Sequence, residues 1–259
     1  MLSNKIIVAN WKMNPNSRDA AGKLLRQYLD RLDLTAVKLL VAPPAIYLDL
    51  LKTSNNTIKL VAQNISWENQ GAFTGQISAA MAKDVGCEYV MLGHSECRKY
   101  QKETDSIIAK KFSLALANGV MPMVCIGETK AQFIQGFTKV KQVLTKQLNF
   151  INKYFANFAN FSNNHAILNS NNQLLIAYEP VWAIGTGEVP KLEYIAKIAK
   201  FITKQLAVTI QNYNQIKILY GGSVNQDNAN QILSLPNIDG ALIGGASLKI
   251  EQLVGIVNL

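Results

Sequence analysis

The residues of this sequence best suited to acid–base chemistry each follow a short apolar run. Glu179 comes directly after Leu174–Tyr178, so its carboxylate should be partly desolvated and suited to act as a base. His94 follows a glycine, at a turn that we expect to open a helix. A helix N-terminus favours a neutral imidazole, which can donate a hydrogen bond without carrying charge. Lys12 follows the first run and offers a cation for a phosphate or a developing oxyanion.

Two glycine pairs near the C-terminus are candidates for phosphate binding. Gly221-Gly222-Ser223 and Gly244-Gly245 each follow an apolar run and precede a segment with helical spacing. Backbone N–H groups of glycine turns at helix N-termini bind phosphate dianions, so we expect a phosphate site here. Gly185-Thr186-Gly187 is not a dinucleotide-binding motif, because Pro190 stands where a third glycine would be needed. This segment suits a lid hinge or a loop that approaches a phosphate.

Eight short apolar runs separate these polar residues, and they are typical of strands buried on both faces of a sheet. The runs are Ile6–Ala9, Val37–Ala42, Ile58–Ala62, Tyr89–Leu92, Met121–Ile126, Leu174–Tyr178, Ile216–Tyr220 and Ile238–Ile243. The segments between them have helical spacing, which predicts an α/β fold with parallel strands and right-handed crossovers. Eight such units favour a closed (β/α)8 barrel with a parallel eight-stranded core. An open doubly wound sheet could use the same alternation.

Helical stripes of apolar residues occupy four of the segments between the runs. They span Ala21–Leu32, Ile108–Leu116, Phe133–Ile151 and Ile195–Leu206. The third stripe begins just after Thr129-x-x-Gln132, which fits a capping box at a helix N-terminus. The asparagine-rich stretch 152–172 predicts a helix end followed by a surface loop. We expect its phenylalanines to pack locally rather than to bind a ligand; they are Phe155, Phe158 and Phe161.

The carboxyl ends of all strands of a parallel barrel meet at one rim, where active sites are built. The residues that follow the apolar runs are Asn10-Trp11-Lys12, Pro43-Pro44, Gln63-Asn64, Gly93-His94-Ser95-Glu96, Gly127-Glu128, Glu179-Pro180, Gly221-Gly222-Ser223 and Gly244-Gly245. The segments that precede the runs contain no comparable set, so we expect the functional site at this rim. Three of these carboxylates, Glu96, Glu128 and Glu179, would also permit a magnesium site.

Length and composition limit the classes of protein that this chain can be. It has 259 residues, 49% of them hydrophobic and 17% charged, which predicts a single barrel domain over residues 1–259. The chain has no run of about 18 apolar residues, so we expect no membrane span, and we expect no signal peptide. Three cysteines without a C-x-x-C pair favour a reducing compartment, and two histidines are too few for a His-rich metal site. The net charge of +9 favours nucleic acid, acidic lipid or phosphorylated metabolites as partners, but the lysines are scattered.

Several motifs of the sequence resemble those of the triosephosphate isomerase family. The matching segments are Asn10–Asn14, Gly71–Gly75, Gly93–Arg98, Cys125–Glu128, Tyr178–Gly187, Tyr220–Ser223 and Gly244–Leu248. They extend over the chain from end to end, and Tyr178–Gly187 is the most specific. The resemblance implies a homodimeric (β/α)8 TIM barrel in the cytoplasm, acting in glycolysis and gluconeogenesis. It would interconvert dihydroxyacetone phosphate and D-glyceraldehyde 3-phosphate through an enediol(ate), with no cofactor, metal, nucleic acid or membrane.

The resemblance also assigns roles to the residues at matching positions. Glu179 would move the carbon-bound proton and an uncharged His94 would polarise the carbonyl, while Lys12 would face the oxyanion and the phosphate. Further substrate contacts would come from Asn10, Gly185, Ser223, Gly244 and Gly245. Residues that support the site would be Glu96, Cys125, Glu128, Trp182 and Tyr220. Pro180–Val189, the lid segment, would close over the substrate, and the loop around Phe73 and Thr74 would enter the partner subunit.

Three positions depart from the common pattern of the family. Gln76 replaces a frequent glutamate in the interface loop, which removes a possible ion pair across the dimer. Glu188 replaces a frequent lysine in the lid segment, and Pro190 has no N–H with which to latch a closed lid. The stretch 152–172 is longer than usual, and we expect it on the helical side, away from the rim.

Overall fold

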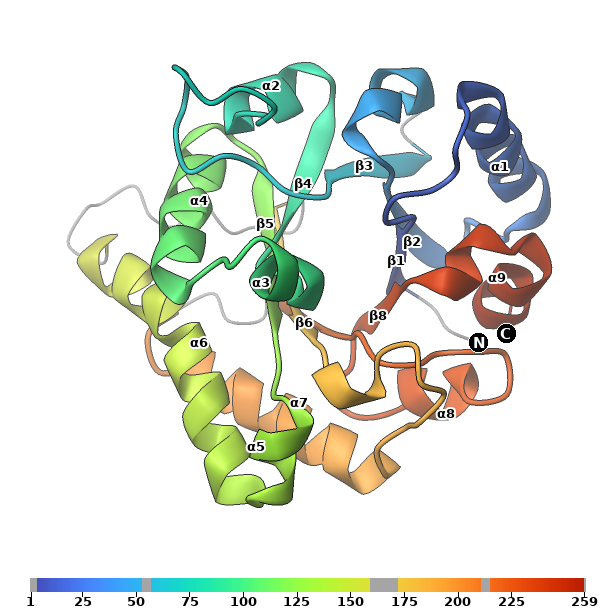
Figure 1. The fold of residues 1–259 in the computed structure, drawn as a ribbon. Coiled ribbons are helices and arrows are strands. Elements are labelled where there is room, and N and C mark those ends of the chain that lie inside the picture. The colour runs from blue at the N-terminus through green and yellow to red at the C-terminus, as the bar shows by residue number, and fades with distance from the viewer. Residues whose placement is uncertain (1–3, 53–56, 159–171, 211–214, 259) are drawn as a thin grey trace.

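Eight parallel strands close into a barrel in this computed structural model, which describes residues 4–52, 57–158, 172–210 and 215–258. The strands are β1 (Lys5–Asn10), β2 (Val37–Ala42), β3 (Ile58–Ala62), β4 (Cys87–Leu92), β5 (Met121–Ile126), β6 (Leu174–Tyr178), β7 (Ile216–Tyr220) and β8 (Gly240–Ile243). They pair in chain order, and β8 pairs with β1 to complete the closure (Figure 1). The predicted (β/α)8 barrel is therefore confirmed. An open sheet is incompatible with this pairing, because its outermost strands would each have only one neighbour.

The apolar runs form strands because both of their faces are covered. Every residue of β5 and of β6 is buried, between the helices outside and the side chains that fill the barrel. The largest differences from the predicted bounds are two residues, at β4, which begins at Cys87 rather than at Tyr89, and at β8, which begins at Gly240 rather than at Ile238. The second has a steric reason. At this position β8 approaches β1 closely, since a Cβ on Gly240 would lie 1.8 Å from the carbonyl oxygen of Ile6.

Helices connect the strands and cover the outside of the barrel (Figure 1). They are α1 (Arg18–Arg31), α2 (Ala79–Asp84), α3 (Ser95–Tyr100), α4 (Asp105–Ala117), α5 (Lys130–Ile134), α6 (Phe137–Phe158), α7 (Leu192–Ala207), α8 (Ala229–Leu233) and α9 (Ile250–Val257). Short 3-10 turns include η1 (Ala45–Tyr47), η2 (Asp49–Leu51), η4 (Val181–Ala183) and η6 (Gly245–Leu248). The first, second and fourth predicted stripes supply the buried faces of α1, α4 and α7.

The third predicted stripe is not a single helix. Its capping box is present, with Thr129 and Gln132 bonding to each other's backbone N–H groups, but α5 ends at Ile134. Gly136 has a φ of 91°, a left-handed conformation that ends a helix and that glycine adopts without strain. The helix therefore breaks there, and α6 begins at Phe137. Phe133 of α5 packs on Trp182, with ring centroids 4.4 Å apart.

The asparagine-rich stretch begins inside α6, as predicted for its first residues. The ring of Phe155 packs edge-on against Phe112 of α4, with centroids 6.4 Å apart, which is the local packing expected. The side chain of Phe158 and the residues from 159 to 171, including Phe161, lie outside the part that the structure describes.

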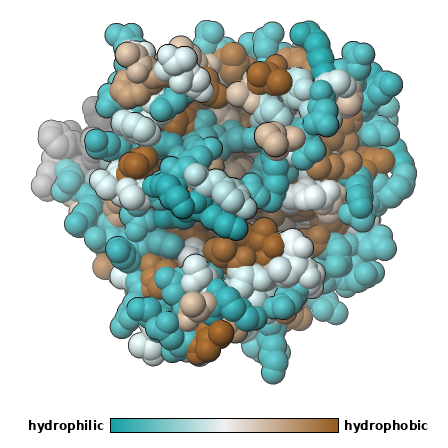
Figure 2. All heavy atoms as spheres, viewed as in Figure 1, coloured by the Kyte–Doolittle hydropathy of each residue, from teal (hydrophilic) through white to brown (hydrophobic). Residues whose placement is uncertain are grey.

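The surface in the view of Figure 2 is mostly hydrophilic, and its hydrophobic side chains form separate patches. Among the described helices, none combines the length and the apolar composition that crossing a bilayer requires.

Candidate active site

Glu179 and His94 meet at the carboxyl ends of β6 and β4. Glu179 follows β6 directly, and His94 caps the N-terminus of α3. Oε1 of Glu179 lies 3.1 Å from Nε2 of His94, and Oε2 accepts a hydrogen bond of 3.0 Å from the N–H of Ser95. Glu179 is 2% exposed and His94 is 6% exposed. A buried carboxylate in contact with an imidazole is an arrangement suited to proton transfer.

The N-terminus of α3 orients the imidazole of His94. The N–H of Glu96 donates to Nδ1 of His94 over 3.2 Å, so Nδ1 must keep its lone pair. The proton of a neutral imidazole is therefore assigned to Nε2, the atom that lies against Glu179. His94 presents a hydrogen-bond donor to the interior of the site.

The surroundings of His94 act in two directions on the expectation that it is uncharged. Burial is the largest single influence and lowers the pKa of His94. The charge of Glu179, the hydrogen bond to it and the charge of Glu96 act in the opposite direction, and together they raise the pKa above its ordinary value. Because Glu179 is the main cause of the rise, turning its carboxylate away would remove most of the stabilisation of the imidazolium.

Lys12 is held at the end of β1 in a conformation that is uncommon for a residue with a side chain. Its φ is 53°, in the left-handed region. Its N–H donates to Oδ1 of Asn10 over 2.9 Å, and its carbonyl accepts from Nε2 of Gln63 over 2.8 Å. Its ammonium lies 2.5 Å from Oε1 of Glu96. Three neighbours therefore hold one lysine in a strained backbone conformation, as is frequent at functional sites.

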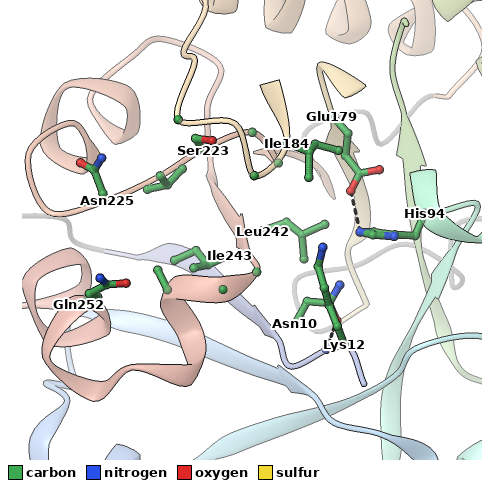
Figure 3. A pocket seen from close by; sticks show the side chains of 18 residues that line it. Asn10, Lys12, His94, Glu179, Ile184, Ser223, Asn225, Leu242, Ile243 and Gln252 are labelled. Atoms are coloured by element: carbon green, nitrogen blue, oxygen red, sulfur yellow. Dashed lines mark hydrogen bonds and ion pairs between the residues drawn. The ribbon is translucent and has the colours of Figure 1, made fainter. Parts of the chain in front are cut away.

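One pocket of about 530 Å³ contains these groups together with the glycine turns. The predicted residues that line it are Asn10, Lys12, His94, Glu179, Gly185, Ser223, Gly244 and Gly245. In Figure 3, Glu179 and His94 face Lys12 and Asn10, while Ser223 lies on the opposite side, beyond Leu242. The acid–base pair and the glycine turns therefore share a cavity of the size that small molecules occupy.

Comparison with known proteins agrees with this geometry. The family model described as triosephosphate isomerase matches residues 5–259 of the chain. The chain belongs to the triosephosphate isomerase family. Among the relatives that bear this name, the protein of Delftia acidovorans is 40% identical, with 99% of this chain and 98% of the relative covered. The protein of Blochmanniella floridana is 38% identical, covering 100% and 96%, and that of Escherichia coli is 39% identical, covering 99% and 97%.

Glu128 of this triosephosphate isomerase family member is a buried carboxylate that does not line the pocket. Its Oε1 accepts hydrogen bonds of 3.0 Å from the hydroxyl of Tyr178 and from Nε1 of Trp182. Its Oε2 has no partner among the described residues. Burial raises the pKa of Glu128, while the donated hydrogen bonds act in the opposite direction. Through Trp182 this carboxylate anchors the first turn of the lid segment.

Tyr220 and Cys125, two further predicted supporting residues, are buried at the ends of β7 and β5. The hydroxyl of Tyr220 has no hydrogen-bond partner in the described part of the chain. A Cβ on Gly222 would come within 2.2 Å of that hydroxyl, so the glycine turn and Tyr220 pack directly on each other. Burial raises the pKa of the Cys125 thiol well above its ordinary range, which leaves it an uncharged packing residue.

The lid segment makes contacts with its surroundings at both ends. The hydroxyl of Ser223 donates to the carbonyl of Ala183 over 2.8 Å. At the other end, Glu188 lies 3.2 Å from the ammonium of Lys130, which also sits 4.6 Å from the ring centroid of Trp182. Glu188, one of the departures from the family pattern, is therefore half of an ion pair with α5.

The loop with Phe73 and Thr74 lies between β3 and α2, outside the pocket. Phe73 packs edge-on against Trp67 with centroids 6.1 Å apart, and Thr74 is exposed. Gln76 is exposed as well. Arg98 pairs with Asp105 of its own chain over 2.7 Å, so its charge has a partner without any contribution from Gln76.

Several pocket residues were not singled out from the sequence as site residues. They are Ile184, Asn225, Leu242, Ile243 and Gln252. Most of them lie within or beside the predicted motifs. Their position near a strand end was therefore the only feature of the sequence that could have identified them as pocket residues. Gln252 belongs to α9 and had no signal, because only the packing of that helix brings it to the pocket.

The carboxylates of the magnesium alternative have separate partners. Glu96 binds Lys12, Glu128 binds Tyr178 and Trp182, and Glu179 lies against His94. Within residues 4–52, 57–158, 172–210 and 215–258, no group of three or more His, Cys, Asp or Glu side chains could hold a metal ion.

Proposed function

We propose that this chain interconverts dihydroxyacetone phosphate and D-glyceraldehyde 3-phosphate through an enediol(ate). The observation that carries the proposal is the contact of Glu179 with Nε2 of His94 in the pocket that Lys12 and the glycine turns also line. A base, a hydrogen-bond donor and a cation in one cavity are the groups needed to move a proton next to a carbonyl. The relatives' name, triosephosphate isomerase, supports this substrate pair.

In the first step, the carboxylate of Glu179 takes a proton from the carbon beside the carbonyl. The electron pair of the broken C–H bond forms a carbon–carbon double bond, and the carbonyl oxygen becomes an enediolate oxygen. That oxygen accepts a hydrogen bond from Nε2 of His94 and is stabilised by the ammonium of Lys12. Asn10, which lines the same pocket, supplies a further polar contact.

In the second step, the proton returns from Glu179 to the neighbouring carbon and the double bond becomes the new carbonyl. A hydroxyl proton passes between the two oxygens, and His94 relays it through Nε2. The protonated carboxylate is restored to its starting form, so the cycle consumes no cofactor.

His94 cannot serve both Glu179 and a substrate oxygen with its single pocket-facing N–H. The carboxylate must therefore leave Nε2 when substrate binds, and the main cause of the raised pKa of His94 leaves with it. The neutral imidazole that the chemistry requires is then favoured by burial and by the N–H that Glu96 donates to Nδ1.

The phosphate of the substrate would lie against the backbone of the glycine turns, on the far side of the pocket from Glu179. The backbone N–H groups that we assign to it are those of Gly185, Ser223, Gly244 and Gly245. Closure of the lid segment would exclude water, which strengthens the electrostatic contacts and protects the enediolate from losing phosphate.

At the level of the whole protein, we propose that residues 1–259 form one domain and that two chains form a homodimer. Four apolar side chains support an interface on one side of the rim, because they follow β1 to β4 and are exposed: Met13, Ile46, Met81 and Tyr100. We place the enzyme in the cytoplasm, in glycolysis and gluconeogenesis, and assign it no nucleic-acid or membrane partner.

The test is turnover of D-glyceraldehyde 3-phosphate to dihydroxyacetone phosphate with EDTA present, read through a coupled NADH-dependent reduction of the product. We expect turnover that resists the chelator, and a fall in kcat of about 10²–10⁴-fold in Glu179→Gln. Glu193→Gln, an exposed glutamate of α7, is the matched control and should retain kcat.

Two results would contradict the proposal. One is a folded Glu179→Gln variant with the kcat of the unmodified chain. The other is turnover that EDTA abolishes and added Mg²⁺ restores, which would favour metal-assisted chemistry.

A further inference from the structure

A second cavity opens at the end of the barrel opposite to the active site. It has a volume of about 470 Å³, within the range of small-molecule sites. Its lining comes from the amino ends of the strands, with Asn4 before β1, Thr35 before β2, Gln173 before β6 and Asp239 before β8. The proposed isomerase chemistry uses none of these residues.

The charged groups of this cavity are mainly lysines. Lys38 of β2 and Lys217 of β7 line it. The ammonium of Lys38 donates to the hydroxyl of Tyr89 over 2.9 Å, and this phenol is its one hydrogen-bond acceptor among the described residues. The pKa of Lys38 is lowered, mainly by burial and then by the positive charge of Lys59, while the charge of Glu88, the partner of Lys59, acts in the opposite direction. Lys38 is thus a partly buried cation without a carboxylate of its own.

Two more lysines flank this pair. Lys59 binds Glu88 over 2.5 Å, and Lys5 donates to the carbonyl of Ile238 over 2.6 Å. Lys217 lies 3.5 Å from Oδ1 of Asp239.

The charged groups in and beside the cavity include fewer carboxylates than lysines. Against the four lysines stand the carboxylates of Glu88 and Asp239, so two positive charges are in excess. Asp33, the nearest further acid along the chain, is exposed and accepts hydrogen bonds from Thr35. The segments outside the described residues, 1–3, 53–56, 159–171, 211–214 and 259, contain no Asp or Glu in their sequence. No side-chain carboxylate remains there to neutralise Lys38.

We propose that this cavity binds a small phosphorylated metabolite, with a phosphate dianion between Lys38 and Lys217. The charge of a dianion matches the local excess, and lysine ammonium groups are common phosphate ligands. The side chains of Asn4, Thr35 and Gln173 offer hydrogen bonds to the rest of the molecule. A concave site of this size suits one small anion rather than a polymer or a bilayer.

The experiment is calorimetric titration with inorganic pyrophosphate at constant ionic strength. It uses the Lys12→Met variant, so that binding of phosphate at the active site is weakened first. We expect one binding event per chain, at least about tenfold weaker when Lys38→Met is added, because a charge-assisted hydrogen bond is lost. Adding Lys110→Met instead, which removes an exposed lysine of α4, should change the affinity less than about twofold.

Thermal unfolding checks that each variant is folded, and Lys217→Gln replaces Lys38→Met if the latter is not. The inference is overturned if Lys12→Met binds no pyrophosphate, or if the Lys38 and Lys110 variants bind it equally. Either result would mean that Lys38 and Lys217 do not form a phosphate site at this end of the barrel. The measurement involves no turnover, so its outcome is independent of the proposed isomerase activity.

Discussion

Close packing positions the side chain of Glu179 at the level of single atoms. A Cβ on Gly221 would come within 2.9 Å of Cγ of Glu179, and one on Gly127 would lie 1.7 Å from its carbonyl oxygen. The neighbouring strand ends therefore leave room for this glutamate only because they carry glycine. The same crowding leaves Glu179 only 2% exposed, with its carboxylate against His94 and Ser95.

Lys12 offers a test at this scale. In Lys12→Met we expect KM for D-glyceraldehyde 3-phosphate to rise and kcat/KM to fall by about 10²-fold or more, because the cation that we assign to the phosphate and the oxyanion is lost. Steady-state kinetics measures the change, with Lys110→Met as the control for loss of one positive charge. Unchanged KM and kcat in a folded Lys12→Met protein would remove Lys12 from the mechanism.

Because Glu128 is buried, we expect the stability of the fold toward unfolding to depend on pH. Burial raises its pKa above 4.5, so the folded protein holds this proton more tightly than the unfolded chain does. Its ionisation therefore destabilises the fold as pH rises above that value. Glu128→Gln, which cannot ionise, should gain unfolding temperature relative to the unmodified chain, by more at pH 8 than at pH 5.

The expected gain is a few degrees, since 1 kcal/mol corresponds to about 2–4 °C in a domain near this size. Calorimetric unfolding at both pH values measures it, and the exposed Glu193→Gln controls for the change in net charge. A gain in unfolding temperature that is larger at pH 5 than at pH 8 would show that ionised Glu128 does not destabilise the fold.

The lid segment contains Glu188, one of the departures from the family pattern. Its end at Glu188 is paired with Lys130, and Lys130 also covers Trp182 at its beginning. One lysine of α5 therefore contacts both ends of the segment. Both partners of the ion pair are about half exposed, so the pair contributes no more than about 1 kcal/mol and is screened by salt.

Glu188→Gln should weaken this contact and ease movement of the lid away from α5. At low ionic strength we expect KM to fall by up to about fivefold, and the difference from the unmodified chain to vanish at about 0.5 M salt. Kinetics across a salt series measures both effects. Glu251→Gln is the matched control, because it removes an exposed ion pair with Arg31 and Glu251 does not line the pocket. A salt-independent change would mean that the pair does not restrain the lid.

At the scale of the whole molecule, barrel closure divides the protein into two chemically different ends. The carboxyl ends of the strands carry the acid–base pair and the glycine turns, and the amino ends carry the lysine-rich cavity. The exposed apolar side chains after β1 to β4 add an asymmetry around the rim. Met13 is 88% exposed and Ile46 is 81% exposed, which is costly for a side chain that stays in water.

The proposed dimer is tested on the loop between β3 and α2. Thr74→Arg should raise the dimer dissociation constant at least about tenfold, because a charge would be buried at the interface without a partner. Light scattering with size exclusion measures the mass, and Thr138→Arg, on an exposed position of α6, is the control. A Thr74→Arg protein with the same mass and the same dissociation constant as the control would place the interface elsewhere.

Local pattern was sufficient to predict most of the fold and to place several candidate site residues at one rim of the barrel. The runs at 37–42, 121–126, 174–178 and 216–220 match their strands residue for residue, because burial on both faces requires an uninterrupted apolar segment. Strand ends in a parallel barrel share one rim, so Glu179, His94 and Lys12 could be placed together without any knowledge of contacts.

The relations between those residues could not be predicted, because they depend on side chains that only barrel closure brings within a few ångström. Each of these relations involves residues from different strand ends. Glu179 raises the pKa of His94, Lys12 pairs with Glu96, and Lys130 pairs with Glu188. The break between α5 and α6 had a local signal in Gly136, but its consequence, the stacking of Phe133 on Trp182, is a tertiary contact. Sequence pattern records which surfaces of each element must be buried, whereas charge states and ion pairs follow from three-dimensional distances that no local pattern contains.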